Sequence, residues 1–244
     1  MSDLMFLVKK VQFITLVLAF CSIIYELLLA HTLSSIHGNA VLRYTITIGL
    51  YLASLGAGTL LSSRHHTITK LFEVESLLAV MGLLAPIIPL FSQFLTEKYL
   101  YTSSGSFGSS LLYNLVLYSG THFMIIVIGV LSGYELPLLI HYYREHKNTK
   151  TGITLAWDYI GTLFGAILFP VIFLPKFGLF GIGAITAIVN GCAAIYIGFQ
   201  TNKNDELLIK INVIVIIVAI LLLNFNDYIT KFLTDEIYLY YLTP

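Results

Sequence analysis

The sequence predicts an all-α integral membrane protein with seven transmembrane helices. Three observations lead to this fold class. Apolar residues make up 57% of the 244 residues, the mean hydropathy is +0.87, and charged residues make up only 11%, against roughly 25% in a soluble domain. In water such a chain would expose large apolar patches, so most of its surface is expected to face hydrocarbon. The same composition argues against a soluble domain, a disordered chain and a basic nucleic-acid-binding surface.

The apolar residues gather in seven runs, each long enough to cross a hydrocarbon core of about 30 Å at a rise of about 1.5 Å per residue. Charged or turn residues separate the runs. They predict helices at about 11–33, 44–62, 74–94, 113–139, 154–174, 178–199 and 207–224. Residues 1–225 would form the transmembrane domain, and residues 226–244 a short interfacial tail rich in aromatic side chains.

Each helix has its own boundary signals. The first run follows Lys9 and Lys10, and it is too long for the apolar part of a signal peptide. The second ends before the basic residues that begin at Arg64, and the third ends before a loop that includes the Ser/Gly-rich residues 103–110. The fourth ends before charged residues of the segment 141–150. The fifth and sixth are separated only by the turn 175–178, so they are expected to form an antiparallel hairpin.

The distribution of the 13 Lys and Arg residues predicts the orientation. Nine of them lie at the N-terminus and in the second, fourth and sixth loops, and four lie on the opposite side. Cytoplasmic loops carry the excess of positive charge, so the N-terminus is expected in the cytoplasm. Seven spans would then leave the C-terminus outside, in a multi-pass protein of the cell (inner) membrane.

The chain also contains a candidate internal repeat. The residues from Tyr25 to Leu29 recur 109 residues later from Tyr134 to Leu138, with Tyr, Glu and two Leu at matching positions. At the same offset Gly56-Ala57 recurs as Gly165-Ala166. The first three helices would therefore repeat as the next three in inverted orientation, a 3+3 inverted repeat followed by a seventh helix. The glycine-rich second and fifth helices are expected to pack closely on their neighbours.

Three carboxylates lie inside the apolar runs. Glu26, Glu135 and Asp158 would each cost about 2.5–3.5 kcal/mol at a helix centre, so each needs a partner, a proton or a water-filled site. By depth, Glu135 and Asp158 could face one another, and Glu26 lies toward the opposite leaflet. Pro137 is expected to break or kink the fourth helix and to free a backbone carbonyl one turn earlier. A tyrosine next to each acid could donate a hydrogen bond to it, which completes the candidate cation-binding set: Glu26, Glu135, Asp158, Tyr25, Tyr134 and Tyr159.

Other reactive side chains are assigned structural roles. His31 is five residues from Glu26, slightly beyond the spacing that brings two side chains together on a helix, so it and His122 are interpreted as interfacial histidines. Cys21 and Cys192 stand inside predicted helices without a partner motif and are interpreted as small apolar residues. No metal site and no cofactor is expected, and no catalytic residue is assigned.

The combined pattern resembles a known family. Tyr25-Glu26, the glycine-rich second helix, the segment from Gly133 to Leu138, and the segment from Asp158 to Pro175 resemble the membrane domain of integral-membrane polyamine aminopropyltransferases, the spermidine synthase-like proteins. The resemblance covers residues 18–200. Fused members of that family carry a soluble catalytic domain that binds decarboxylated S-adenosylmethionine and a diamine. This sequence contains no strand followed by G-x-G-x-x-G, so the resemblance implies a stand-alone membrane module without that domain.

Several functions follow as expectations. The leading one is a non-catalytic module that anchors or gates a partner and offers an acidic intramembrane site to a cation such as a polyamine. Its partners would be the lipid bilayer, a cationic small molecule, and a separately encoded soluble synthase or another membrane subunit, with no nucleic acid. The alternative is a small secondary transporter for an amine or cation. An intramembrane enzyme using two carboxylates and a purely structural subunit are the remaining possibilities.

Overall fold

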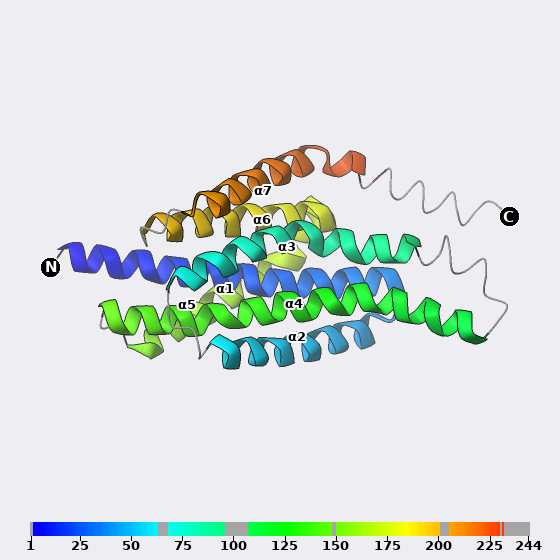
Figure 1. Ribbon diagram of the computed structural model, residues 1–244, viewed down its shortest axis with the longest axis horizontal. Helices are drawn as coiled ribbons and strands as arrows, with labels where there is room; N and C mark the ends of the chain where they lie inside the picture. Colours follow the sequence, from blue (N-terminus) through cyan, green and yellow to red (C-terminus); the bar gives the residue numbers. More distant parts are fainter. Residues whose placement is uncertain are drawn as a thin grey trace.

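The computed structural model describes residues 2–62, 68–95, 107–147, 150–200, 205–229 and 231. Within these ranges the chain is helical and has no strand (Figure 1). Its elements are α1 (Ser2–His37), α2 (Ala40–Ser62), α3 (Ile68–Leu95), α4 (Phe107–Lys147), α5 (Thr151–Leu168), the π-helix η2 (Phe169–Phe173), α6 (Leu174–Gln200) and α7 (Glu206–Asn224).

Six segments in the described ranges are long and apolar enough to cross a membrane. Five of them are 19 to 26 residues long, and the sixth, Thr151–Gln200, has 50 residues. Many of their apolar side chains point outward: Leu60 is 74% exposed, Val171 67% and Leu207 67%. Surfaces of this kind are stable against lipid tails and unstable in water, so the helices have the length and the surface that crossing a membrane requires.

Several helices are longer than the apolar runs that predict them. α1 begins at Ser2, and α4 covers 107–147, so the loop expected at 103–110 is wrong for residues 107–110 and lies outside the described residues for the rest. The polar N-terminal end of α1 and the C-terminal end of α4 contain neither Gly nor Pro, and the single Gly108 at the start of α4 does not stop the helix, so the helical backbone continues into the polar zone. Between α1 and α2 the chain turns at Gly38 and Asn39, whose φ angles are +65° and +47°.

The 50-residue segment contains one reversal. Gly178 has φ +59° and ψ −173°, a combination that is essentially restricted to glycine, and it interrupts the helical backbone within α6. The segment has 27 residues before Gly178 and 22 after it, roughly 40 Å and 33 Å of helix, which is enough for two crossings. α5 and the main part of α6 run in opposite directions, as Figure 1 shows. This is the antiparallel hairpin that the short connection predicts.

α1 lies at the centre of the bundle, in contact with α2, α3, α4, α5 and α6 (Figure 1). It runs parallel to α5, because Gly161 packs against the backbone of Leu16 and Gly165 against the backbone of Phe20. The absence of a side chain at these two glycines lets the α5 backbone approach that of α1 closely.

A second parallel pair is formed by α2 and α4. Gly129 packs against Tyr51, and Gly133 packs against Leu55 and the Cα of Gly58. The bundle therefore contains two glycine-lined parallel pairs, α1 with α5 and α2 with α4. On the far side α3 packs antiparallel to α6, and α7 covers both.

The predicted interfacial tail lies largely outside the described residues. Residues 226–229 are helical and follow α7, while 230 and 232–244 are not described.

Candidate functional site

A cavity of about 760 Å³ lies among α1, α2, α4 and α5, between the two parallel pairs. On α4 its wall extends from Ser132 to Arg144, about 18 Å along the helix axis, which is more than half of a hydrocarbon core. Arg144 is exposed at the end of the bundle where α1 begins. Leu52 and Tyr159 are exposed too, so the cavity is also bounded by residues that face the surroundings of the bundle.

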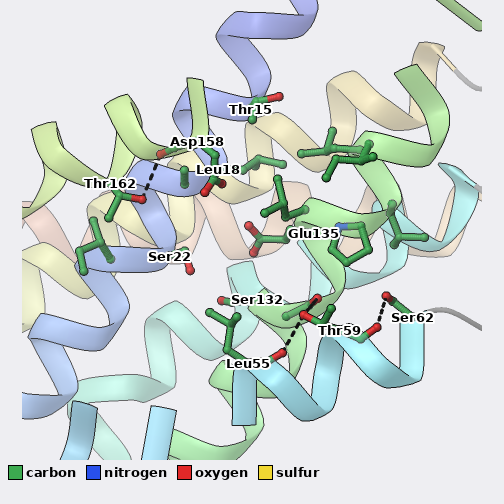
Figure 2. A pocket seen from close by; sticks show the side chains of 18 of the residues that line it. Thr15, Leu18, Ser22, Leu55, Thr59, Ser62, Ser132, Glu135, Asp158 and Thr162 are labelled. Atoms are coloured by element: carbon green, nitrogen blue, oxygen red, sulfur yellow. Dashed lines mark hydrogen bonds between the residues drawn. The ribbon is translucent and has the colours of Figure 1, made fainter. Parts of the chain in front are cut away.

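The cavity brings together all three of the intramembrane acids named from the sequence. Glu26, Glu135 and Asp158 line it from α1, α4 and α5 respectively. Figure 2 shows Glu135 and Asp158 with their side chains directed toward the space between the helices. The two carboxyl groups are close enough to interact electrostatically, so they face one another as the depth argument predicts.

Glu26 lies at the other end of the same cavity. Gly161 is level with Leu16 on the parallel helices α5 and α1. Asp158 is three residues before Gly161 and Glu26 is ten residues after Leu16, which separates the two acids by roughly 20 Å along the axis. Glu135 interacts with Cys21 and therefore lies between these levels. Within the described residues no three His, Cys, Asp or Glu side chains are grouped closely enough to hold a metal ion.

Hydroxyl groups surround the acids in the cavity. Figure 2 shows them on all four walls. Their small size and ability to donate hydrogen bonds place polar groups within a lining that is mostly apolar. The hydroxyl residues that line it, besides tyrosines, are Thr15, Ser22, Thr59, Ser62, Ser132 and Thr162.

Pro137 lies inside a continuous α4 and does not break the helix. It removes the backbone donor that would bond the carbonyl oxygen of Gly133 one turn earlier. Thr59 on α2 replaces that donor: its Oγ1 lies 3.1 Å from the Gly133 oxygen and 3.0 Å from the Leu55 oxygen of its own helix. The freed carbonyl thus links the α2–α4 pair next to Glu135, and both Gly133 and Thr59 line the cavity.

The tyrosines differ in position. The Tyr25 hydroxyl donates to the Leu78 carbonyl oxygen at 2.8 Å and accepts from Asn190 Nδ2 at 2.9 Å, so its hydrogen is not available to Glu26. Helical geometry turns Tyr25 about 100° away from its neighbour, toward α3 and α6. Tyr134 packs within the apolar core and does not line the cavity, whereas Tyr159 lines it and is 66% exposed.

Tyr51 on α2 is the tyrosine that the sequence analysis missed. It is fully buried, lines the cavity and interacts electrostatically with both Glu26 and Glu135. Its hydroxyl donates to the Ser22 carbonyl oxygen at 3.0 Å. It has no acid beside it in the sequence, so only the packing of α2 on α1 could reveal its position.

Glu75 on α3 is a fourth intramembrane acid, also missed. Its side chain is 0% exposed, and neither carboxyl oxygen has a hydrogen-bond partner among the described residues. It does not line the cavity, yet it interacts electrostatically with Glu135, Cys21 and Tyr25. In the sequence, Glu75 stands at the start of the apolar run 74–94 and two residues after Glu73, so it looks like part of the polar segment that precedes a membrane helix. The helix begins at Ile68, however, which puts Glu75 two turns inside.

The remaining candidates lie away from the cavity. His31 Nδ1 is 3.1 Å from the Tyr44 hydroxyl, and its ring packs edge-on against Phe169. His122 does not line the cavity. Cys21 is buried and Cys192 exposed, and neither forms a disulfide.

Most of the chain is similar to proteins named polyamine aminopropyltransferase. One from Leptospira interrogans is 29% identical over 230 residues, 91% of this chain and 43% of that protein. One from Oceanobacillus iheyensis is 31% identical over 212 residues, 85% of this chain and 38% of that protein. One from Mycobacterium tuberculosis is 32% identical over 185 residues, 72% of this chain and 32% of that protein.

The chain thus spans less than half the length of these three relatives. No protein-family model and no solved structure matches it. The similarity supports a relation to the polyamine aminopropyltransferases.

Proposed function

We propose that the chain is a membrane module related to the polyamine aminopropyltransferases, and that its acidic cavity binds an organic cation such as a polyamine. The observation that carries the proposal is the convergence of Glu26, Glu135 and Asp158 on one cavity. Acids inside a membrane domain are costly and almost always face a polar cavity or a partner, so their convergence favours a ligand of opposite charge.

The shape of the cavity suits an elongated ligand. A polyamine is a flexible aliphatic chain with ammonium groups separated by several bonds. The acids lie at successive levels over roughly 20 Å, with apolar residues such as Leu52 and Leu55 between them. Ammonium groups would form charge-assisted hydrogen bonds with the acids, and the methylene groups would contact the apolar wall. Tyr51 and Tyr159 would add ring faces that attract cations.

The module itself is proposed to be non-catalytic. It would anchor or gate a partner, a soluble synthase or another membrane subunit, that performs the chemistry. With the N-terminus in the cytoplasm, the end of the cavity at His141 and Arg144 would face the cytoplasm. An amine held in the cavity would then be close to a cytoplasmic partner.

Binding of spermidine to the purified chain in lipid nanodiscs tests the proposal. Each charge-assisted hydrogen bond contributes about 1.5–3 kcal/mol, so Glu135→Gln and Asp158→Asn should each weaken binding roughly 10- to 150-fold. Glu206→Gln is the matched control, because Glu206 is 81% exposed in side-chain area and pairs with Lys210 on α7. Equal affinity in all four proteins, or no binding to the wild type, would refute the cation site.

A secondary transporter is the second candidate, supported by the two parallel pairs. α1 packs on α5 as α4 packs on α2, which is the arrangement that an inverted repeat of three helices with an offset of 109 residues requires. In such repeats the site lies between the copies, and rocking of one copy opens it to alternate sides. Spermidine uptake into proteoliposomes that is abolished by Glu135→Gln favours transport. Binding without uptake favours the anchoring module.

A further inference from the structure

Glu75 is a buried acid that the cavity does not use. It lies on α3, behind the α1 and α4 walls, with no exposed area and no hydrogen-bond partner at either carboxyl oxygen among the described residues. A site for a cation alone does not need such a group, because no ligand in the cavity reaches it directly.

The surroundings of Glu75 offer it little to stabilise a negative charge. α1 presents Cys21 and Tyr25, and the Tyr25 hydrogen is already donated to the Leu78 carbonyl oxygen. α4 presents Glu135, which is itself acidic.

The other two helices packed on α3 contribute uncharged amides. Asn190 of α6 bonds to Tyr25, and Asn212 of α7 bonds to Ser76. The Oδ1 atoms of both amides are buried, and in the described part of the chain neither has a hydrogen-bond partner. Among the residues that the structure describes, the titratable groups that face Glu75 are therefore a thiol, a phenol and a second carboxyl group, and none of these three brings a positive charge.

Two carboxyl groups that interact electrostatically in an apolar interior resist ionising together. A negative charge on the buried Glu75 would lack solvent, and it would repel a charge on Glu135, so the pair holds a proton in the absence of a cation. Glu135 is the member of the pair that lines the cavity, and Glu75 is the member shielded from it. The pair thus connects a ligand-facing acid to a buried one.

We infer that Glu75 and Glu135 form a proton-binding pair that exchanges its proton for the cation bound in the cavity. This inference rests on the proposed cation site and adds that cation binding there is accompanied by release of a proton. When an ammonium group arrives beside Glu135, the carboxyl O–H bond breaks, the proton passes to water at the open end of the cavity, and the ammonium balances the new negative charge. When the cation leaves, a proton from water rebinds, so the charge of the site stays constant.

Calorimetry of spermidine binding in nanodiscs counts the protons. The heat measured in two buffers of different ionisation enthalpy at one pH gives the number released. We expect the wild-type protein to release about one proton per bound spermidine. Protons released or taken up by spermidine itself are measured in a titration without protein and subtracted. Glu75→Gln removes one acid of the pair, so release should fall toward zero while spermidine still binds.

Glu73→Gln is the matched control. Glu73 precedes Glu75 by two residues on the same helix, is 35% exposed in side-chain area and pairs with Lys70 at 2.8 Å, so its loss should leave proton release unchanged. A wild type that binds spermidine without releasing a proton would overturn the inference and leave the cation site standing. A wild type that does not bind spermidine would overturn both.

A measurement on the wild type alone covers the possibility that Glu75→Gln does not fold. A hydrophobic carbodiimide modifies protonated carboxyl groups in apolar surroundings, and mass spectrometry locates the adduct. We expect labelling of Glu75 or Glu135 that spermidine reduces, with Glu206 unlabelled. Absence of an adduct on both members of the pair would overturn the inference.

Discussion

The close contact between α2 and α4 makes Gly133→Ala the most informative test of the fold. A Cβ at Gly133 would lie 3.0 Å from the Cα of Gly58 and 3.0 Å from the carbonyl carbon of Leu55, and nearer still to the Leu55 oxygen. All of these are backbone atoms, so no side-chain rotation relieves the contact. Ordinary contact between such atoms is about 3.5–4.0 Å. The helices must therefore separate by roughly 1 Å.

The cost follows from overpacking. Forcing one methyl group into a well-packed contact destabilises a protein by about 1–3 kcal/mol. For a chain of this size, each kcal/mol lowers the melting temperature by about 2–4 °C, so Gly133→Ala should lower it by roughly 2–12 °C. Gly133 also lines the cavity next to Thr59, and separating α2 from α4 would weaken the bond from Thr59 to the carbonyl freed by Pro137.

Gly56→Ala is the matched control on α2. A Cβ at Gly56 meets no atom within 4 Å. Replacing an exposed helical glycine with alanine usually stabilises a helix by about 0.5–1 kcal/mol, so this variant should melt at the same or a higher temperature. Thermal unfolding of both variants in one detergent, followed by intrinsic fluorescence, makes the comparison. If Gly133→Ala melts no lower than Gly56→Ala, the α2–α4 contact is not as close as described.

Two further predictions concern stability. Tyr25→Phe removes the donor to the Leu78 carbonyl oxygen and the acceptor for Asn190. Unfolding measurements should therefore show that the free energy of unfolding falls by about 1–3 kcal/mol. An unchanged melting temperature would mean that this buried network contributes nothing to stability. Gly178→Ala puts a side chain at φ +59°, a conformation that costs about 1–3 kcal/mol, so this variant should melt at a lower temperature. Gly152 has open space around it and no positive φ, so the control Gly152→Ala should not destabilise the protein. Equal melting temperatures of the two variants would contradict the sharp reversal in α6.

Composition and hydropathy were sufficient to predict the helical class and the approximate position of each helix. They could not predict helix ends, because α1 and α4 continue as helices past the apolar runs into polar residues. The hairpin around Gly178 was predictable because a connection of a few residues leaves the chain no other route. The inverted repeat stays a prediction, supported by equivalent glycine contacts in the two parallel pairs.

The acids show where prediction from the sequence reaches its limit. Glu26, Glu135 and Asp158 stand out because each interrupts an apolar run, and all three line the cavity. Glu75 is buried by α1 and α4, which are distant in the sequence, so its burial cannot be read from neighbouring residues. Tyr25 shows the opposite error: it is adjacent to Glu26 in the chain, but helical geometry directs it to Asn190 on another helix.

The parallel packing of α1 on α5 has a consequence for biosynthesis. Leu16 and Gly161, which touch in the folded bundle, are 145 residues apart in the chain. At a translation rate of about 5–20 residues per second, the ribosome adds Gly161 roughly 7–30 s after Leu16. During that interval Glu26 and then Glu135 are inserted while the fourth wall of the cavity does not yet exist. Nascent chains arrested before α5 should therefore expose both acids to lipid and be degraded by membrane proteases.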